Sequence, residues 1–122
     1  MAAEDAGLSE LDPGTAVFYG VSTMNTDDVL DAYNVAVQGR RLHPSSNPKS
    51  MTNAVAAWIP ILFGTHGRTL VISTACASGT DAIGAAYEHI AMGKSKTAVC
   101  GAADRQAGYP LRSHRIIRLR RT

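Results

Sequence analysis

Apolar positions in the first forty residues predict a strand followed by a helix. Residues 16–22 are apolar, contain β-branched and aromatic side chains and follow the turn pair Pro13-Gly14, which is typical of a buried strand. The helix begins near Thr26, which can cap it, and it ends at Gly39. Its apolar positions recur at helical spacing: Val29, Leu30, Tyr33 and Val37.

A loop and a second helix are predicted next. Residues 40–50 carry two prolines and several turn-forming residues, so we expect a loop there. Residues 51–63 are apolar nearly all round, which indicates a buried helix, shortened or kinked by Pro60 and ended by Gly64.

The remaining regular pattern is strand, helix, strand. Residues 69–73 predict a strand, residues 78–92 a helix that Gly93 closes, and residues 97–101 another strand. The helix is rich in small residues, which favour close packing: Ala82, Gly84, Ala85, Ala86 and Ala91. This order predicts an α/β layered fold with a mainly parallel sheet core, in which the last strand–helix–strand unit is parallel.

Charge is distributed unevenly along the chain. Residues 1–104 hold six basic side chains against all ten acidic ones, a net charge of −4, whereas residues 105–122 hold six arginines and no acid, a net charge of +6. We interpret this tail as a solvated charge run and expect no nucleic-acid partner. Within it, Ile116, Ile117 and Leu119 fit either a short strand or a helix.

Composition places the chain among globular proteins. Its 122 residues allow one ordinary domain, and 45% are hydrophobic while only 18% are charged. No run approaches the roughly 18 apolar residues of a membrane span, and the acidic N-terminus is unlike a secretory signal, so we expect a cytoplasmic protein without a membrane partner. Two cysteines make no disulfide framework and fit a reducing compartment.

The stretch from Val71 to Gly84 carries the candidate chemistry. A buried strand runs through a tight turn into a helix rich in small residues, and Cys76 lies in the turn. A thiol at a helix N-terminus faces the positive end of the helix dipole and unpaired backbone N–H groups, which favours a reactive thiolate. Such a cysteine can accept an acyl group from a thioester. By position alone, Cys76 also fits an inert buried thiol.

Three motifs in this region resemble the active-site signature of the β-ketoacyl synthases. They are Thr74-Ala75-Cys76-Ala77-Ser78-Gly79, then Ala82-Ile83-Gly84, and finally Gly101-Ala102-Ala103-Asp104 at the end of a strand. Upstream segments resemble the same family in the expected order. The resemblance covers residues 1–104, read as a fragment of the N-terminal domain, and leaves residues 105–122 as an arginine-rich tail outside the family pattern.

The resemblance implies an incomplete half of a thiolase-like fold, usually dimeric, and the activity of a 3-oxoacyl-[acyl-carrier-protein] synthase-type acyltransferase in fatty-acid or polyketide synthesis. By this match Cys76 is the catalytic residue and holds the acyl group delivered by an acyl carrier protein. A malonyl unit is decarboxylated, and the resulting carbanion attacks the acyl group in a Claisen condensation. We expect a homodimer or pairing with a complementary synthase chain, and neither a cofactor nor a bound metal.

The two catalytic histidines that the resemblance leads us to expect are missing from this sequence. The family uses two histidines in glycine-containing motifs downstream of the cysteine, and none of the four histidines of this chain matches them: His43, His66, His89 and His114. We therefore expect the chain alone to be inactive in condensation. Cys100 fits the core better than a catalytic role, and Asp104 fits a structural role.

Three hypotheses remain open from the sequence. The chain supplies the acylated cysteine of a condensing enzyme, it pairs with a full-length synthase without catalysis, or it is a fragment with no selected role. A partial fold of this kind leaves sheet edges and an apolar interface exposed, which promotes aggregation or pairing with another chain.

Overall fold

A four-stranded sheet forms the centre of the computed structural model, which describes residues 11–23, 26–104 and 113–120. Its strands lie in the order β2 (Thr69–Ile72), β1 (Ala16–Gly20), β3 (Thr97–Asp104) and β4 (Ser113–Arg120). Strand β1 is parallel to both of its neighbours, and β4 is antiparallel to β3. The three strands expected from the apolar pattern are therefore present, and their parallel arrangement is confirmed.

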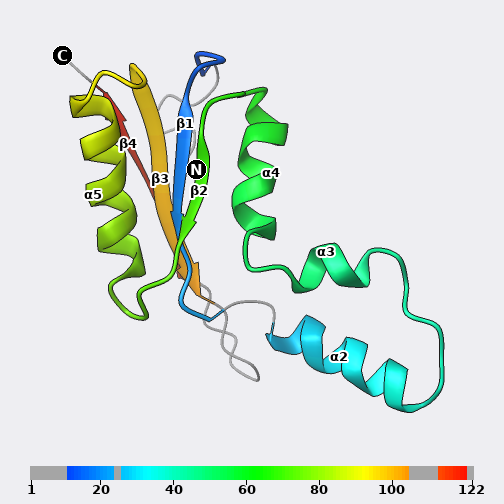
Figure 1. Cartoon of the computed structure of the whole chain (residues 1–122). Coiled ribbons are helices and arrows are strands. Elements are labelled where there is room, and N and C mark those ends of the chain that lie inside the picture. Colours follow the sequence, from blue (N-terminus) through cyan, green and yellow to red (C-terminus); the bar gives the residue numbers. More distant parts are fainter. Residues whose placement is uncertain (1–10, 24–25, 105–112, 121–122) are drawn as a thin grey trace.

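One helix covers each face of the sheet (Figure 1). Helix α4 (Ala54–Phe63) packs on the face that includes Val17 and Tyr19, while α5 (Ser78–Ala91) packs on the face that includes Phe18 and Cys100. Alternate residues of β1 enter the two clusters because successive side chains of a strand point to opposite faces. This explains why β1 is buried along its whole length. Its sequence therefore lacks the alternation of apolar and polar residues that is typical of a strand with one solvent-exposed face.

Small residues let α5 lie close to the sheet. Ala82 and Ala86, one turn apart, are fully buried against β1 and β3 together with Ile90. Gly84 lies on the other side of the helix, where an added Cβ would meet nothing within 4 Å. The close packing predicted for this helix is therefore confirmed for its buried alanines and does not extend to Gly84.

The segment between β1 and α4 extends away from the sheet (Figure 1). Helix α2 (Thr26–Val37) has no buried residue, and the short helix α3 (Ser46–Ser50) follows it. The prediction of an uninterrupted loop over residues 40–50 was wrong at α3. Pro48 lies in the first turn of α3. Proline is tolerated there because the backbone N–H groups of a first turn make no hydrogen bond within the helix, so the lack of an N–H costs nothing.

Helix α4 differs from its prediction in burial. Only Ala56 and Ile59 are buried, whereas Trp58, Ile61 and Leu62 are 60%, 68% and 72% exposed. The expectation of a helix buried all round was therefore wrong for this chain, because only one face of α4 meets the sheet. The expected exposure of an apolar surface is confirmed here.

The third predicted strand is longer than expected, and a fourth strand follows it. Strand β3 continues to Asp104, beyond the predicted end at residue 101, and β4 pairs with it from Ser113 to Arg120. Of the two possibilities for this basic segment, strand or helix, the backbone forms a strand. An arginine-rich sequence is compatible with a strand at the edge of a sheet, where charged side chains disfavour unwanted pairing.

Candidate functional site

The turn between β2 and α5 presents Cys76 at the carboxyl end of the parallel strands. Ala75 has φ 52°, in the left-handed region that a residue with a side chain seldom adopts. Two backbone hydrogen bonds close the turn, from Ala77 N–H to Thr74 O and from Ser78 N–H to Ala75 O, both 3.1 Å. Cys76 is exposed at this turn, two residues before α5 begins at Ser78.

The hydroxyl of Ser78 holds this turn in place. It accepts a hydrogen bond from Thr74 N–H at 2.8 Å and donates to Ala75 O at 2.6 Å, with Val21 O as a second acceptor at 3.3 Å. Ser78 is only 3% exposed, so water does not replace these partners readily. One buried hydroxyl therefore ties the strained Ala75 to the helix and to the segment that follows β1.

The backbone of α5 begins in direct contact with the end of β1. A Cβ added to Gly20 would lie 2.4 Å from Ser78 O and 2.7 Å from Gly79 N. Only a residue without a side chain allows this approach. Neither Gly20 nor the bonding role of Ser78 was identified from the sequence; the available signal was a glycine inside an otherwise bulky apolar strand.

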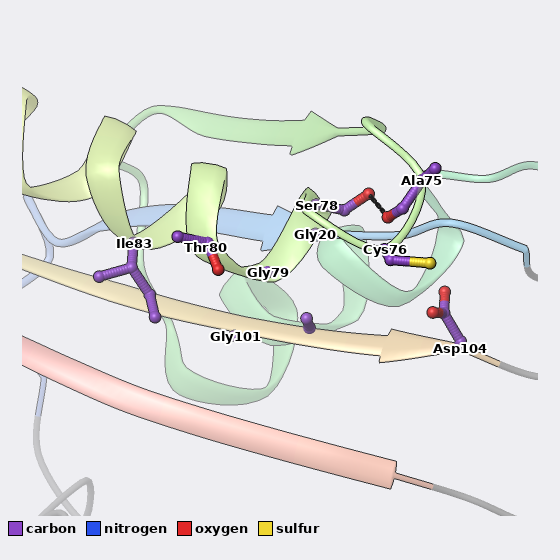
Figure 2. Close-up of a pocket in the computed structure, with 10 residues that line it drawn as sticks. Gly20, Ala75, Cys76, Ser78, Gly79, Thr80, Ile83, Gly101 and Asp104 are labelled. Carbon is purple, nitrogen blue, oxygen red and sulfur yellow. Dashed lines mark hydrogen bonds between the residues drawn. The ribbon is translucent and has the colours of Figure 1, made fainter.

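A pocket of about 260 Å³ lies beside Cys76, between the start of α5 and the end of β3 (Figure 2). Small residues form most of its wall, and Thr80, Ile83 and Asp104 are the larger ones. The full set is Gly20, Ala75, Cys76, Ser78, Gly79, Thr80, Ile83, Gly101, Ala102 and Asp104. The structure therefore brings the three sequence motifs around one cavity that has Cys76 in its wall.

Asp104, which lines this pocket, orders the backbone of the segment that follows β1. Its Oδ1 accepts hydrogen bonds from Ser22 N–H at 2.6 Å and from Thr23 N–H at 3.1 Å. Burial raises the pKa of Tyr19, and the negative charge of Asp104 raises it further. The structural role predicted for Asp104 agrees with this bonding, although its side chain also lines the pocket.

The two cysteines occupy opposite environments. Cys100 is fully buried in β3, and this burial raises the pKa of its thiol, whereas Cys76 is exposed. We expect iodoacetamide to alkylate Cys76 in the folded chain at least roughly tenfold faster than Cys100, and both residues at similar rates in denaturant. Peptide mass spectrometry of a labelling time course measures both rates. Equal labelling in the folded chain would contradict the burial of Cys100.

The histidines whose side chains are described lie away from the pocket. His43 bonds to Ser45 through Nδ1 at 2.7 Å, and His66 is exposed. His89 packs edge-on against Phe18, with ring centroids 5.2 Å apart. Partial burial lowers the pKa of His89, and the positive charges of Arg68 and Lys94 lower it further. His114 lies in β4, where the backbone alone is described.

Residues 11–23, 26–104 and 113–120 hold neither a metal-binding cluster nor a membrane-spanning helix. No cluster of three or more histidine, cysteine, aspartate or glutamate side chains suited to a metal ion occurs there. Within the same residues, every helix is too short or too polar to cross a membrane.

Known proteins resemble this chain over most of its length. Residues 1–110 match the family described as "Beta-ketoacyl synthase, N-terminal domain". The chain belongs to the β-ketoacyl synthase family. The 3-oxoacyl-[acyl-carrier-protein] synthase 2 of Vibrio harveyi is 30% identical over 115 residues, which are 90% of this chain and 28% of that protein. A 3-oxoacyl-[acyl-carrier-protein] synthase homolog of Saccharomyces cerevisiae is 34% identical over 80 residues, which are 62% of this chain and 18% of that protein.

Solved ketosynthase structures share the fold. A β-ketoacyl synthase from Burkholderia phymatum superimposes with a TM-score of 0.75 at 32% identity, covering 88% of this chain and 28% of that one. A ketosynthase bound to a hexaketide and in complex with its type II PKS acyl carrier protein gives a TM-score of 0.75 at 25% identity, over 88% of this chain and 29% of that one. The ketosynthase chain thus has the expected partial thiolase-like α/β fold and spans less than a third of each of these proteins.

Proposed function

We propose that this ketosynthase chain supplies the cysteine that accepts an acyl group in decarboxylating condensation. The observation that carries the proposal is the position of Cys76: exposed, in a strained turn at the start of α5, and in the wall of a cavity built from the family's own motifs. The acyl donor we propose is the thioester of an acyl carrier protein, the partner named for one of the similar ketosynthases.

The transfer is a thioester exchange. The Cys76 sulfur attacks the carbonyl carbon of the donor and forms a new C–S bond, while the bond to the carrier thiol breaks and the Cys76 proton passes to the departing thiolate. The backbone N–H of Cys76 is positioned by the turn and would donate to the developing oxyanion. Positive charge at the start of α5 favours the same negative oxygen.

Condensation requires further groups. The family's two histidines match no residue of this chain, and the described side chains of His43, His66 and His89 lie outside the Cys76 pocket. We propose that decarboxylation of the malonyl unit depends on a histidine-bearing half that is not among these 122 residues. Cys76 acylation is therefore the step that this chain can perform by itself.

The sheet edge and α4 support pairing with a second chain. Strand β2 lies at one edge of the sheet formed by the described residues, where none of them pairs with its outer side, and α4 exposes Trp58, Ile61 and Leu62. An unpaired strand edge beside an exposed apolar surface is a surface that proteins usually cover. We propose that a synthase chain, either a second copy or a complementary chain, occupies it.

A reducing compartment is consistent with this chemistry. Neither Cys76 nor Cys100 forms a disulfide within the described residues, and acyl transfer requires the Cys76 thiol to remain reduced. We therefore propose the cytoplasm as the place of action.

Intact-mass spectrometry of the full chain after incubation with an acyl carrier protein thioester tests the proposal. We expect one acyl adduct on the wild type and on Cys100→Ser, which removes only the buried thiol, and none on Cys76→Ser. Circular dichroism establishes that each variant is folded. A folded wild type without an adduct, or an adduct that persists in Cys76→Ser, would refute the role of Cys76 and leave the pairing hypothesis as the better account.

A further inference from the structure

A second pocket, of about 160 Å³, lies at the other end of α5 from Cys76 and has His89 in its wall. We call it the His89 pocket. In Figure 1 the last turn of α5 reaches the end of the sheet at which the parallel strands begin. From Ser78 to His89 the helix rises roughly 16 Å at 1.5 Å per residue. The two pockets share no lining residue, so the His89 pocket is a separate site.

The floor of the His89 pocket is apolar and comes from both the sheet and the helix. It is formed by Phe18 of β1, Leu70 of β2 and Ala85 of α5. Phe18 is 2% exposed, and the other two side chains are partly buried against the cluster that contains it. An apolar cavity of roughly 150 Å³ is large enough to hold a benzene ring. The floor therefore suits a compact apolar group of about that size.

The rim of the His89 pocket is cationic. Arg68 precedes β2, His89 lies on α5, and Lys94 lies in the turn after this helix. Glu88 is the one acidic residue of the wall, and no ion pair within the described residues joins it to Arg68 or Lys94. With His89 neutral the wall carries two positive charges and one negative charge, and protonation of His89 adds a third positive charge. The rim therefore favours an anion.

Helix capping does not account for these cations. Basic side chains near the end of a helix often pair with its last carbonyl groups. Here the backbone N–H groups of residues 92–94 already donate to carbonyls of the last turn, over distances of 2.9–3.1 Å. Arg68 belongs to a different element, and its carbonyl accepts a hydrogen bond of 2.7 Å from Val17 N–H, which fixes the start of β2 beside β1. The fold therefore brings the cations together from two segments.

The charge of His89 is coupled to that of its neighbours. Burial lowers the pKa of His89, and the positive charges of Arg68 and Lys94 lower it further. Phe18, which packs against the His89 ring from β1, brings no charge. A carboxylate bound among these cations would favour the imidazolium and raise the pKa of His89. Because such coupling is reciprocal, a carboxylate would bind more tightly as the pH falls through the His89 pKa.

We propose that the His89 pocket binds a small organic carboxylate, with its compact apolar body on the floor and its carboxylate among the cations of the rim. Ligand pockets of this kind combine a mainly apolar wall with a few polar groups that fix the orientation of the ligand. Inorganic phosphate would meet the rim alone, and an uncharged aromatic molecule would meet the floor alone. The site goes beyond the proposed acylation of Cys76 and does not depend on it.

Benzoate titrated into the full chain at constant ionic strength tests the proposal, with the histidine ring protons followed by NMR. We expect a saturable shift of the His89 signals with a Kd of about 1–10 mM, while His43 and His66, outside the pocket, keep their shifts. The affinity should rise as the pH is lowered over the range in which benzoate stays ionised. Benzamide, which lacks the charge, and acetate, which lacks the ring, should each bind at least about fivefold more weakly.

Three results would overturn this assignment of the ligand. They are the lack of a saturable His89 shift, a shift shared by all histidines, and binding of inorganic phosphate as tight as that of benzoate. The first two would show that the pocket does not bind benzoate. The third would show that the apolar floor takes no part in binding.

Lys94→Gln and Lys96→Gln are matched variants of the rim. Both remove a positive charge from an exposed lysine in the connection between α5 and β3, but only Lys94 lines the pocket. We expect Lys94→Gln to weaken benzoate binding roughly two- to fivefold and Lys96→Gln to leave it unchanged. Equal Kd values for the two variants would contradict recognition of the carboxylate by the rim. Cys76→Ser should bind benzoate as the wild type does, which separates this site from the proposed acylation.

Discussion

Gly20→Ala is expected to destabilise the fold and abolish acylation of Cys76. The added Cβ would lie 2.4 Å from Ser78 O, 2.5 Å from Ser78 C and 2.7 Å from Gly79 N. All three atoms belong to the backbone, so no side chain can rotate away and the start of α5 has to move. Overpacking of this kind costs about 1–3 kcal/mol of unfolding free energy, and sometimes more.

Gly84→Ala is the matched control for that variant. Both substitutions add one methyl group, but a Cβ at Gly84 would meet nothing within 4 Å, and alanine is the better helix former. We expect Gly84→Ala to gain about 0.5–1 kcal/mol and to keep acylation. Urea unfolding and intact-mass spectrometry of both variants measure the two effects. Equal unfolding midpoints would show that β1 and α5 are not in the close contact described.

The Cys76 turn was predictable because its signal is local. A run of apolar residues gives the strand, small residues allow the tight turn, and helical spacing resumes at Ser78, all within a few positions of the cysteine. The three motifs were grouped by their resemblance to one family signature, and the parallel strands explain why the motifs on β2 and β3 meet, since their carboxyl ends lie at the same edge of the sheet. The pocket formed by those motifs is the direct result.

The bonding of Ser78 could not be predicted in the same way. Its hydroxyl reaches Val21 O, a residue 57 positions earlier, and these segments meet only because β1 pairs with β2 and α5 packs on β1. The burial of α4 was also misjudged, because its composition suits a helix covered on all sides. An apolar composition indicates that a helix surface is more stable when it is buried, but it does not tell which chain supplies the covering element. In this chain Trp58 remains exposed.

Ser78→Ala is expected to loosen the turn without disturbing the helix. Alanine is a better helix former than serine, so α5 itself should be retained. The Thr74 N–H would lose its acceptor, and Ala75 O and the buried Val21 O would lose their donor. Leaving one buried polar group unpaired costs about 1–3 kcal/mol. We expect a loss of that size in urea unfolding and at least a tenfold drop in the rate of Cys76 acylation, since an error of about 1 Å in position can cost roughly a hundredfold.

Ser95→Ala separates this effect from the general loss of a hydroxyl. The Ser95 hydroxyl is buried and, within the described part of the chain, has no hydrogen-bond partner, so its removal should leave stability unchanged or raise it. A drop in acylation for Ser78→Ala alone, in a chain that circular dichroism shows to be folded, would identify the hydroxyl as a positioning group for Cys76. Equal acylation in the two variants would mean that the backbone bonds of Ala77 and Ser78 suffice to hold the strained turn.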